Sequence, residues 1–495
     1  MKNNIPVVKL GIVAVSRDCF PIELSRKRLV SVQEAYERAF GNLFAANVII
    51  ECEADVSRAL GELQQAKVNA LVIYLGNFGP EGPETLLAQR FNGPVMLAAA
   101  EEERGDDLIN GRGDAYCGLL NASYSLGLRG IKCYIPEKPI GSAAHVAELM
   151  NVFSSVACVV IGVRALKIIT FGPRPQDFLA CNAPIKPLYD LGLVGIQENS
   201  ELDLLDAFKK HENDARIPDL QKEMQIEVGE GPMTGVIPRL AQYELTLMDW
   251  VKNNSGAADY VVMANKCWPA FAGNFGCVPC YVNSRFSSRL MPIACEVDIY
   301  GALSEFMVAC ATHVSPSILD INNTVPADIY EHEIKGKYPY SSDDIFMAFH
   351  CGNTPIEHLV KGDLKYQFIM KRGIEPDSEP DLTRGTLEGD IKPGNITLFR
   401  LQSSADCQLR AYIAQGEVLP IATRSFGSIG IFAVREMIRF YRHVLIEKQY
   451  PHHAAVGFGK AGTVLFEALK FLGVDEVDYN REKGSVYPGE NPFFV

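Results

Sequence analysis

Three carboxylates of this chain stand in stretches that are otherwise apolar. Glu296 and Asp298 lie within residues 294–304, which read ACEVDIYGALS, and Asp320 lies in the run SILDIN at 317–322. Carboxylates in such surroundings are rarely buried unless they are paired, hydrogen-bonded or bound to a metal. Asp298 has an ordinary explanation as the cap of a helix that begins next to it. Asp320 alone is best explained as a turn or cap residue, whereas Glu296 has no such simple structural explanation.

Histidines stand beside two further apolar runs. His350 ends the run FMAFH at 346–350, and the pair His452 and His453 precedes the apolar run 454–456. Each alone is more often structural. Strand ends meet at the carboxyl edge of an open α/β sheet, so two carboxylates and one or two imidazoles can form a mixed oxygen and nitrogen site there. Such a donor set suits Mn²⁺ or Mg²⁺, which can hold two vicinal sugar oxygens, better than it suits thiolate-preferring metals.

The elements that must position these residues follow from the apolar pattern. In the first third, short apolar runs alternate with amphipathic segments, which predicts a parallel sheet covered by helices. The predicted strands are 7–15, 48–51, 70–75 and 94–99, and the predicted helices are 23–40, 56–65 and 83–90. The pattern restarts with predicted strands at 166–171, 193–197 and 260–264 and predicted helices ending near 189 and spanning 236–251.

The texture changes after about residue 313, where Gly, Pro and Asp become frequent. Predicted strands at 396–401, 409–414 and 417–422 follow each other directly, which favours antiparallel structure. We therefore predict an α/β protein with two Rossmann-like parallel domains followed by a β-rich, barrel-like domain. The predicted domains are 1–163, then 164–312 with Glu296, then 313–495 with Asp320 and His453.

Composition excludes several classes of protein. The 495 residues are 47% hydrophobic and 22% charged, as in globular proteins. The formal charge of -13 repels nucleic acid and anionic membranes. Residues 1–10 show no secretory signal, and the apolar stretch 152–163 is too short to span a bilayer. Thirteen cysteines, including one C-x-x-C pair, fit reduced thiols without a structural zinc site. We expect a soluble cytoplasmic protein without nucleic acid or membrane partners.

Five motifs taken together resemble the L-fucose isomerase family and its shorter relatives, with L-arabinose isomerase as a more distant cousin. They are CWPAF at 267–271, ACEVDIYGAL at 294–303, LDIN at 319–322, FHCGN at 349–353 and HHA at 452–454. Residues 11–20 and the turn FGPRP at 171–175 also look like the first two domains of that family. Each motif alone is unspecific, but the combination is specific and covers most of the chain.

The resemblance implies an aldose–ketose isomerase that works through a cis-enediol with a catalytic Mn²⁺, for which Mg²⁺ or Co²⁺ can substitute. It assigns Glu296, Asp320 and His453 as metal ligands, and Glu296 and Asp320 also as the acid/base pair. His453 is preferred over His452 because the family's ligand immediately precedes the strand of small residues. The pairing of a metal with a neighbouring carboxylate suits this chemistry, because the metal acidifies the C2 hydrogen and the carboxylate moves it.

Four further residues are expected near the substrate. Arg17 resembles an N-terminal arginine that approaches the substrate in the family, and a surface salt bridge is its equal alternative. Trp268 is expected to face the sugar or to belong to the core. His350 resembles a metal-proximal histidine of the arabinose isomerases, and Asn353 is assigned to hydroxyl recognition.

The resemblance does not carry over the identity of the sugar, because this chain is shorter than the long fucose isomerases and its first-domain loops do not align with theirs. L-fucose and D-arabinose are the first candidates. Shorter relatives act on other sugars, including the C6-sulfonated hexose sulfoquinovose, whose anion would meet Arg17, Lys266, Arg285 or Arg289. The family's subunits form trimers or hexamers, which implies a homo-oligomer here.

Two rival classes are considered. A non-catalytic sugar-binding protein is possible because two α/β units with a cleft also describe binding domains. The predicted β-rich third domain counts against this class. A dinucleotide-dependent oxidoreductase is disfavoured because no G-x-G-x-x-G follows the first predicted strand.

Overall fold

The computed structural model describes residues 4–105, 108–182, 184–229 and 233–493. Contacts within the chain divide it into two compact units. One unit comprises residues 6–161 and 467–473, and the other comprises 1–5, 162–466 and 474–495. We call them the N-terminal unit and the main unit. The division of the chain into three domains stays a prediction.

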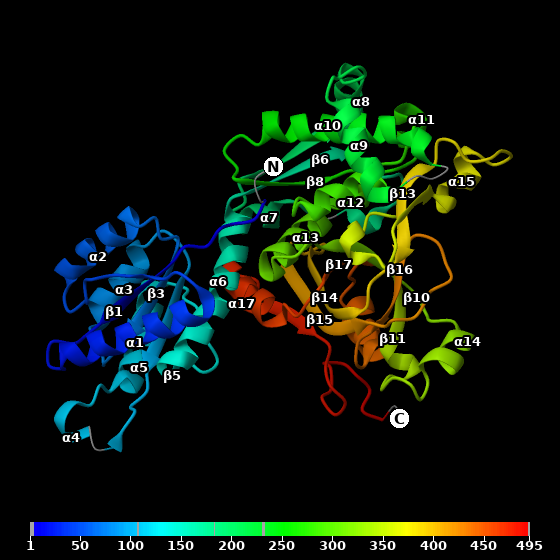
Figure 1. Cartoon of the computed structure of the whole chain (residues 1–495). Helices are drawn as coiled ribbons and strands as arrows, with labels where there is room; N and C mark the ends of the chain where they lie inside the picture. Colours follow the sequence, from blue (N-terminus) through cyan, green and yellow to red (C-terminus); the bar gives the residue numbers. More distant parts are fainter. Residues whose placement is uncertain (1–3, 106–107, 183, 230–232, 494–495) are drawn as a thin grey trace. The chain divides into compact units, whose positions relative to one another are not determined.

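The N-terminal unit is built on a five-stranded parallel sheet in the order β2-β1-β3-β4-β5 (Figure 1). The central strands are fully buried and apolar, as expected when helices cover both faces of a parallel sheet. The strands are β1 (Leu10–Val15), β2 (Phe44–Ala45), β3 (Ala70–Leu75), β4 (Val95–Ala100) and β5 (Ile140–Gly141). The longer helices are α1 (Ile22–Phe40), α2 (Glu53–Gln65), α3 (Glu81–Arg90), α5 (Ala115–Arg129) and α6 (Ala143–Arg164).

The predicted strand at 48–51 is wrong. The second strand lies earlier, at Phe44–Ala45, and Ile50 makes only a single bridge to Val15. Ile50 is nevertheless buried against the same core as α2, α3 and α5. The apolar pattern at 48–51 therefore predicted burial correctly, but these residues do not form a strand of the sheet.

Helix α6 is the one helix in the described part of the chain that is long and apolar enough to cross a membrane. Of its most apolar window, 61% is buried inside the protein, and core helices of soluble proteins pass the same test of length and composition. The helix spans 22 residues, so it is longer than the apolar stretch at 152–163 indicated.

The main unit begins with a second parallel sheet, in the order β7-β6-β8-β9. Its strands are β6 (Leu166–Gly172), β7 (Gly195–Ser200), β8 (Tyr260–Ala264) and β9 (Ile293–Ala294). The principal helices are α8 (Glu201–Lys210), α9 (Ile217–Val228), α10 (Ile237–Asn254), α12 (Cys280–Ser288) and α13 (Ile299–Thr312). Both parallel sheets agree with the predicted fold class.

A nine-stranded mixed sheet follows, in the order β12-β13-β16-β11-β10-β17-β14-β15-β18. An additional pairing of β15 with β16 joins six of these strands into a closed ring, so this part is barrel-like as predicted. The ring consists of β10 (Ser317–Asn323), β11 (Ile345–His350), β14 (Gly394–Ser403), β15 (Leu409–Val418), β16 (Ser428–Ala433) and β17 (His453–Gly457). The remaining strands are β12 (Asp363–Tyr366), β13 (Arg384–Asp390) and β18 (Glu476–Tyr479), and helix α17 (Gly462–Leu472) lies between β17 and β18 in sequence.

The predicted strand at 417–422 is also wrong beyond its first two residues, which belong to β15. Leu419 and Ile421 are buried, so the apolar pattern is real. Pro420 lies between them and has no N–H to contribute to a ladder, which explains why the strand ends at Val418.

Candidate metal centre

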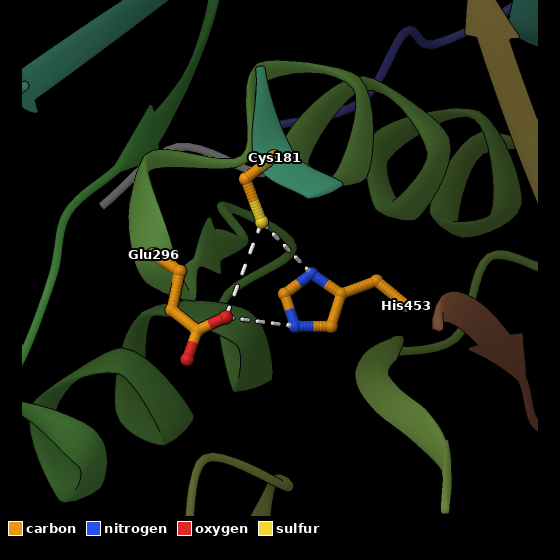
Figure 2. A group of neighbouring side chains, drawn as sticks. All are labelled: Cys181, Glu296 and His453. Atoms are coloured by element: carbon orange, nitrogen blue, oxygen red, sulfur yellow. Dashed lines mark hydrogen bonds and ion pairs between the residues drawn. The ribbon is translucent and has the colours of Figure 1, made fainter. Parts of the chain in front are cut away.

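Asp320 and His453 lie opposite each other on the neighbouring antiparallel strands β10 and β17. The register directs both side chains to one place, where His453 Nε2 lies 3.4 Å from Asp320 Oδ1. Glu296 approaches from the short helical turn η4 (Cys295–Val297) between β9 and α13, and its Oε2 also lies 3.4 Å from His453 Nε2 (Figure 2). One imidazole nitrogen therefore lies at equal distances from two carboxylate oxygens.

The backbone that presents Glu296 is strained. Glu296 and Val297 have φ values of 61° and 57°, in the left-handed region that non-glycine residues rarely enter. Such residues persist when their surroundings fix them, at about 1–3 kcal/mol each. Here the N–H of Val297 donates to the carbonyl oxygen of Asn265 at 2.7 Å, which ties the turn to the end of β8.

Asp298 holds the other side of the imidazole. Its Oδ2 lies 2.8 Å from His453 Nδ1, and its Oδ1 accepts from the N–H of Gly301 at 2.8 Å, so it also caps α13 as predicted. Arg400, on β14, donates to both carboxylate oxygens at 2.5 and 2.9 Å. All three side chains are buried. Because an ionised carboxylate can only accept, Asp298 holds the proton of His453 on Nδ1 and leaves Nε2 free as a ligand.

Electrostatics in the centre favour a cation. Burial raises the pKa of Glu296 above its ordinary value and raises the pKa of Asp320 to about 6. Burial alone would also raise the pKa of Asp298, but the charges and hydrogen bonds of Arg400 and His453 hold it below its usual range. Three carboxylates thus surround one imidazole, and one guanidinium balances only part of their charge.

The residues fit a divalent metal ion. Asp320 Oδ1 and His453 Nε2 are buried and have no hydrogen-bond partner, which is unusual for polar atoms unless something else occupies the space between them. Ligands about 2.1 Å from a six-coordinate cation lie about 3 Å apart, close to the 3.4 Å separations seen here. Two carboxylates and one imidazole suit Mn²⁺ or Mg²⁺.

His452 and Cys181 border the same centre. His452 Nε2 lies 3.7 Å from Asp320 Oδ1, and Cys181 Sγ lies 3.9 Å from Glu296 Oε2 and 3.7 Å from His453 Nδ1 (Figure 2). His453 contacts both carboxylates, so the geometry favours it over His452 as the third ligand. Burial raises the pKa of Cys181 to about 11, so this thiol stays protonated near neutral pH.

The other predicted substrate residues of the main unit, Trp268, His350 and Asn353, differ in burial and in their contacts with the centre. Phe178 contacts the ring of His452 edge-on at 5.4 Å and the ring of Trp268 edge-on at 6.4 Å, so an aromatic row extends from the centre to Trp268. His350 is buried with its ring 5.8 Å from that of His453, and burial lowers its pKa to about 3. Asn353 is buried, and its Oδ1 has no hydrogen-bond partner.

Arg17 belongs to the N-terminal unit and therefore to a different compact body from the metal centre. Its guanidinium pairs with Glu81 at 3.4 Å and stacks over the ring of Phe78 at 4.9 Å. A salt bridge, the alternative considered from the sequence, is thus present. The role of Arg17 toward a substrate stays a prediction.

Sequence reasoning missed Arg400, Cys181 and the second role of Asp298. Arg400 carried a usable signal, because it interrupts the apolar run TLFRL at 397–401 just as Glu296 interrupts its own run. Cys181 carried none, since it ends a single 3₁₀ turn (Leu179–Cys181) and its neighbours in sequence form no pattern.

Comparisons with known proteins identify the family of this chain. A protein-family model described as the N-terminal domain of fucose/sulfoquinovose isomerase matches residues 11–164, and one described as the C-terminal domain of L-fucose isomerase matches residues 348–480. Together they cover more than half of the chain. The chain belongs to the L-fucose isomerase family.

Three relatives of this chain are named sulfoquinovose isomerase. The chain is 24% identical over 322 residues to a sulfoquinovose isomerase of Alkalicoccus urumqiensis, and the aligned part covers 63% of this chain and 65% of the relative. It is 21% identical over 322 residues to one of Priestia aryabhattai, which is 63% of this chain and 64% of that relative. A sulfoquinovose isomerase of Clostridium sp. (strain MSTE9) is 23% identical over 412 residues, or 81% of this chain and 84% of the relative. The chain thus aligns with less than two thirds of the length of the first two relatives.

Proposed function

We propose that this protein is a metal-dependent aldose–ketose isomerase that acts on a sugar through a cis-enediol. The observation that carries the proposal is the convergence of Glu296, Asp320 and His453, in which one buried nitrogen lies 3.4 Å from each of two carboxylate oxygens. Membership of the L-fucose isomerase family supports it. A structural salt-bridge cluster is a poorer explanation, because two of the donor atoms are buried without hydrogen bonds.

In this mechanism Glu296, Asp320 and His453 would hold a divalent cation, with Mn²⁺ as our first choice. When bound, the cation would supply Lewis-acid polarisation of the sugar at its reacting carbons. We assign Glu296 and Asp320 as the acid/base pair that moves the proton between C2 and C1 of the bound sugar. The Asp298–Arg400 pair fixes His453 in the tautomer that presents Nε2, so this nitrogen stays available as a ligand.

We propose a hexose with a C6 sulfonate as the substrate, ahead of L-fucose and D-arabinose. The names of the relatives support this order. The four cations considered from the sequence are all paired with acids: Arg17 with Glu81, Lys266 with Glu201, and Arg285 and Arg289 with Glu244.

Arg174 is different from these four cations. It lines a cavity of about 440 Å³ whose wall also includes Cys181, the neighbour of Glu296 and His453. Its Nε is buried without a hydrogen-bond partner, and no carboxylate of the described residues forms an ion pair with it. The carboxylate of Glu198 is exposed on the same cavity wall, and it is the one acidic group there. We assign Arg174 as the counter-ion of the sulfonate.

The test is isomerisation by the full chain after metal removal and re-addition of Mn²⁺. Sulfoquinovose, L-fucose and D-arabinose are each supplied in D₂O, and NMR follows ketose formation and deuterium uptake at C1 of the ketose. We expect metal-dependent turnover with uptake of deuterium, and we expect it to disappear in Glu296→Gln. Glu388→Gln, which changes a buried carboxylate of the main unit outside the centre, is the matched control and should stay active. Sugar binding without turnover of any of the three would contradict the proposal and favour a binding protein.

We further propose that the protein is a soluble cytoplasmic homo-oligomer. The family resemblance suggests trimers or hexamers, and the negative charge of the chain supports the absence of nucleic acid or membrane partners. Light scattering on the purified chain measures the assembly directly.

A further inference from the structure

Helix α5 has two apolar faces, and the N-terminal unit uses only one of them. Its inner face supplies Ala115, Leu119, Ala122 and Leu126 to the core that α2 and α3 share. The sequence AYCGLLNASYSLGLR contains a single charge, at Arg129. A helix that is apolar on all sides is normally buried on all sides. The outer face of α5 is therefore expected to have a partner.

The outer face carries a regular stripe of large side chains. Tyr116, Leu120, Tyr124 and Leu128 follow each other at intervals of four residues, and each is between 63% and 72% exposed. Residues four apart form one continuous ridge along a helix. Single exposed apolar residues need no explanation, but a contiguous row of four marks an interaction surface.

We propose that this stripe is a two-fold contact between two copies of the chain, in which α5 packs antiparallel against α5 of the partner. The order of the side chains fits that symmetry. In an antiparallel pair centred near residue 122, Leu120 meets Tyr124 of the partner subunit, and Tyr116 meets Leu128 of the partner subunit. Each contact then joins one aromatic and one aliphatic side chain, and each occurs twice with the two subunits exchanged, as two-fold symmetry requires.

The size and the charge of the stripe agree with a second copy as its occupant. Tyrosines bury about 150–250 Å² each when fully covered, so two tyrosines and two leucines at these exposures remove roughly 400–500 Å² per subunit. Two copies bury roughly 900 Å² before any rim residue is counted, just below the ~1,000 Å² that a specific interface should exceed, so rim residues must supply the remainder. The stripe itself holds no charge, so two copies meet without repulsion.

Charge substitution within the stripe tests the contact, with particle mass by light scattering as the readout. Leu120→Glu and Tyr124→Lys change exposed positions and should fold, yet each should reduce the mass of the assembly twofold. The double variant should regain mass at low salt, because the introduced carboxylate of one subunit then faces the introduced ammonium group of the other. Val30→Glu, on the exposed side of α1, is the matched control and should leave the mass unchanged.

A cross-link tests the register. Cys117 is exposed, and an antiparallel pair places it opposite position 127 of the second copy. A side chain at Gly127 meets no atom within 4 Å, so Gly127→Cys is tolerated. Mild oxidation should then join two chains covalently, and adding Cys117→Ser should abolish the product.

Two results overturn the proposal. One is an unchanged mass of Leu120→Glu together with a lowered melting temperature, which would mean that the stripe packs inside its own chain. The other is a wild-type protein that is monomeric at micromolar concentration. Both readouts are independent of catalysis, so the inference can fail while the proposed isomerase activity stands, and the reverse also holds.

Discussion

Asp298 offers the sharpest test of the centre, because its two carboxylate oxygens have different hydrogen-bond partners. Oδ1 accepts from the N–H of Gly301 and from Arg400, whereas Oδ2 contacts Arg400 and His453 Nδ1. In Asp298→Asn the amide oxygen must keep the position that faces the backbone N–H. The amide NH₂ then takes the place of Oδ2, where it faces a guanidinium donor and the imidazole.

Two separate losses follow from this substitution. The NH₂ donates to His453 Nδ1, so the imidazole proton moves to Nε2 and the metal-facing lone pair is lost. Removing such an orienting carboxylate lowers metal affinity by about 10–100-fold, or roughly 1.4–2.7 kcal/mol. Arg400 is also left buried without a counter-charge, which costs about 3–5 kcal/mol of stability.

Calorimetric Mn²⁺ titration and thermal unfolding in EDTA separate the two losses. Glu244→Gln is the control, because Glu244 is equally buried and holds Arg285 and Arg289, each at 2.6 Å, without touching the centre. It should lower the melting temperature, because Arg289 loses its counter-charge, and leave the affinity for Mn²⁺ unchanged. The reasoning is refuted if Asp298→Asn binds Mn²⁺ as tightly as the wild type, or if Glu244→Gln weakens binding equally.

Three further predictions address other parts of the molecule. In Asp320→Asn, Mn²⁺ should no longer raise the melting temperature, because a metal ligand is lost. The metal-free variant should melt no lower than the metal-free wild type. A full metal-induced shift in the variant would remove Asp320 from the ligand set. Glu84 is fully buried with both oxygens unpartnered, and burial raises its pKa to about 8. Because this folded pKa exceeds the ordinary 4.5, the contribution of Glu84 to stability is most favourable below pH 4.5 and falls as the pH rises to 8, by up to about 5 kcal/mol. Glu84→Gln should therefore melt several degrees higher than the wild type at pH 8 and nearly equally at pH 5, and equal melting at both pH values would count against it. Arg174→Met should raise the KM for a C6-sulfonated hexose at least tenfold and leave the KM for a neutral sugar unchanged. Lys186→Met controls for the change in net charge. An equal rise in KM for both sugars would contradict the role of Arg174 as the counter-ion of the sulfonate.

Residue patterns predicted much of the fold and the centre, and the exceptions have physical causes. Parallel strands are buried on both faces, so β1, β3 and β8 stood out as continuous apolar runs. Glu296 stood out because a carboxylate is anomalous in such a run. The short β2 and the end of β15 were misplaced, since an apolar pattern reports burial and not backbone hydrogen bonding.

The parts of the centre that sequence reasoning missed depend on contacts between distant segments. Arg400 lies 102 positions from Asp298, and Cys181 lies 272 positions from His453. No local pattern encodes such pairs, because Arg400 and His453 lie on strands of the closed ring, whereas Asp298 and Cys181 lie in separate segments that pack against it. The equal distances from His453 Nε2 to Glu296 and Asp320 could likewise be known only from the folded chain.

The left-handed turn at Glu296 and Val297 limits which substitutions can stabilise this protein without loss of activity. Glycine at position 297 would relax the turn and make the folded chain easier to form. The same freedom would also let the carboxylate of Glu296 change its position. A displacement of a fraction of an ångström from the reacting carbon lowers the rate of proton transfer. Greater heat resistance should therefore be sought elsewhere in the chain, since gains made at this turn would come at the expense of turnover.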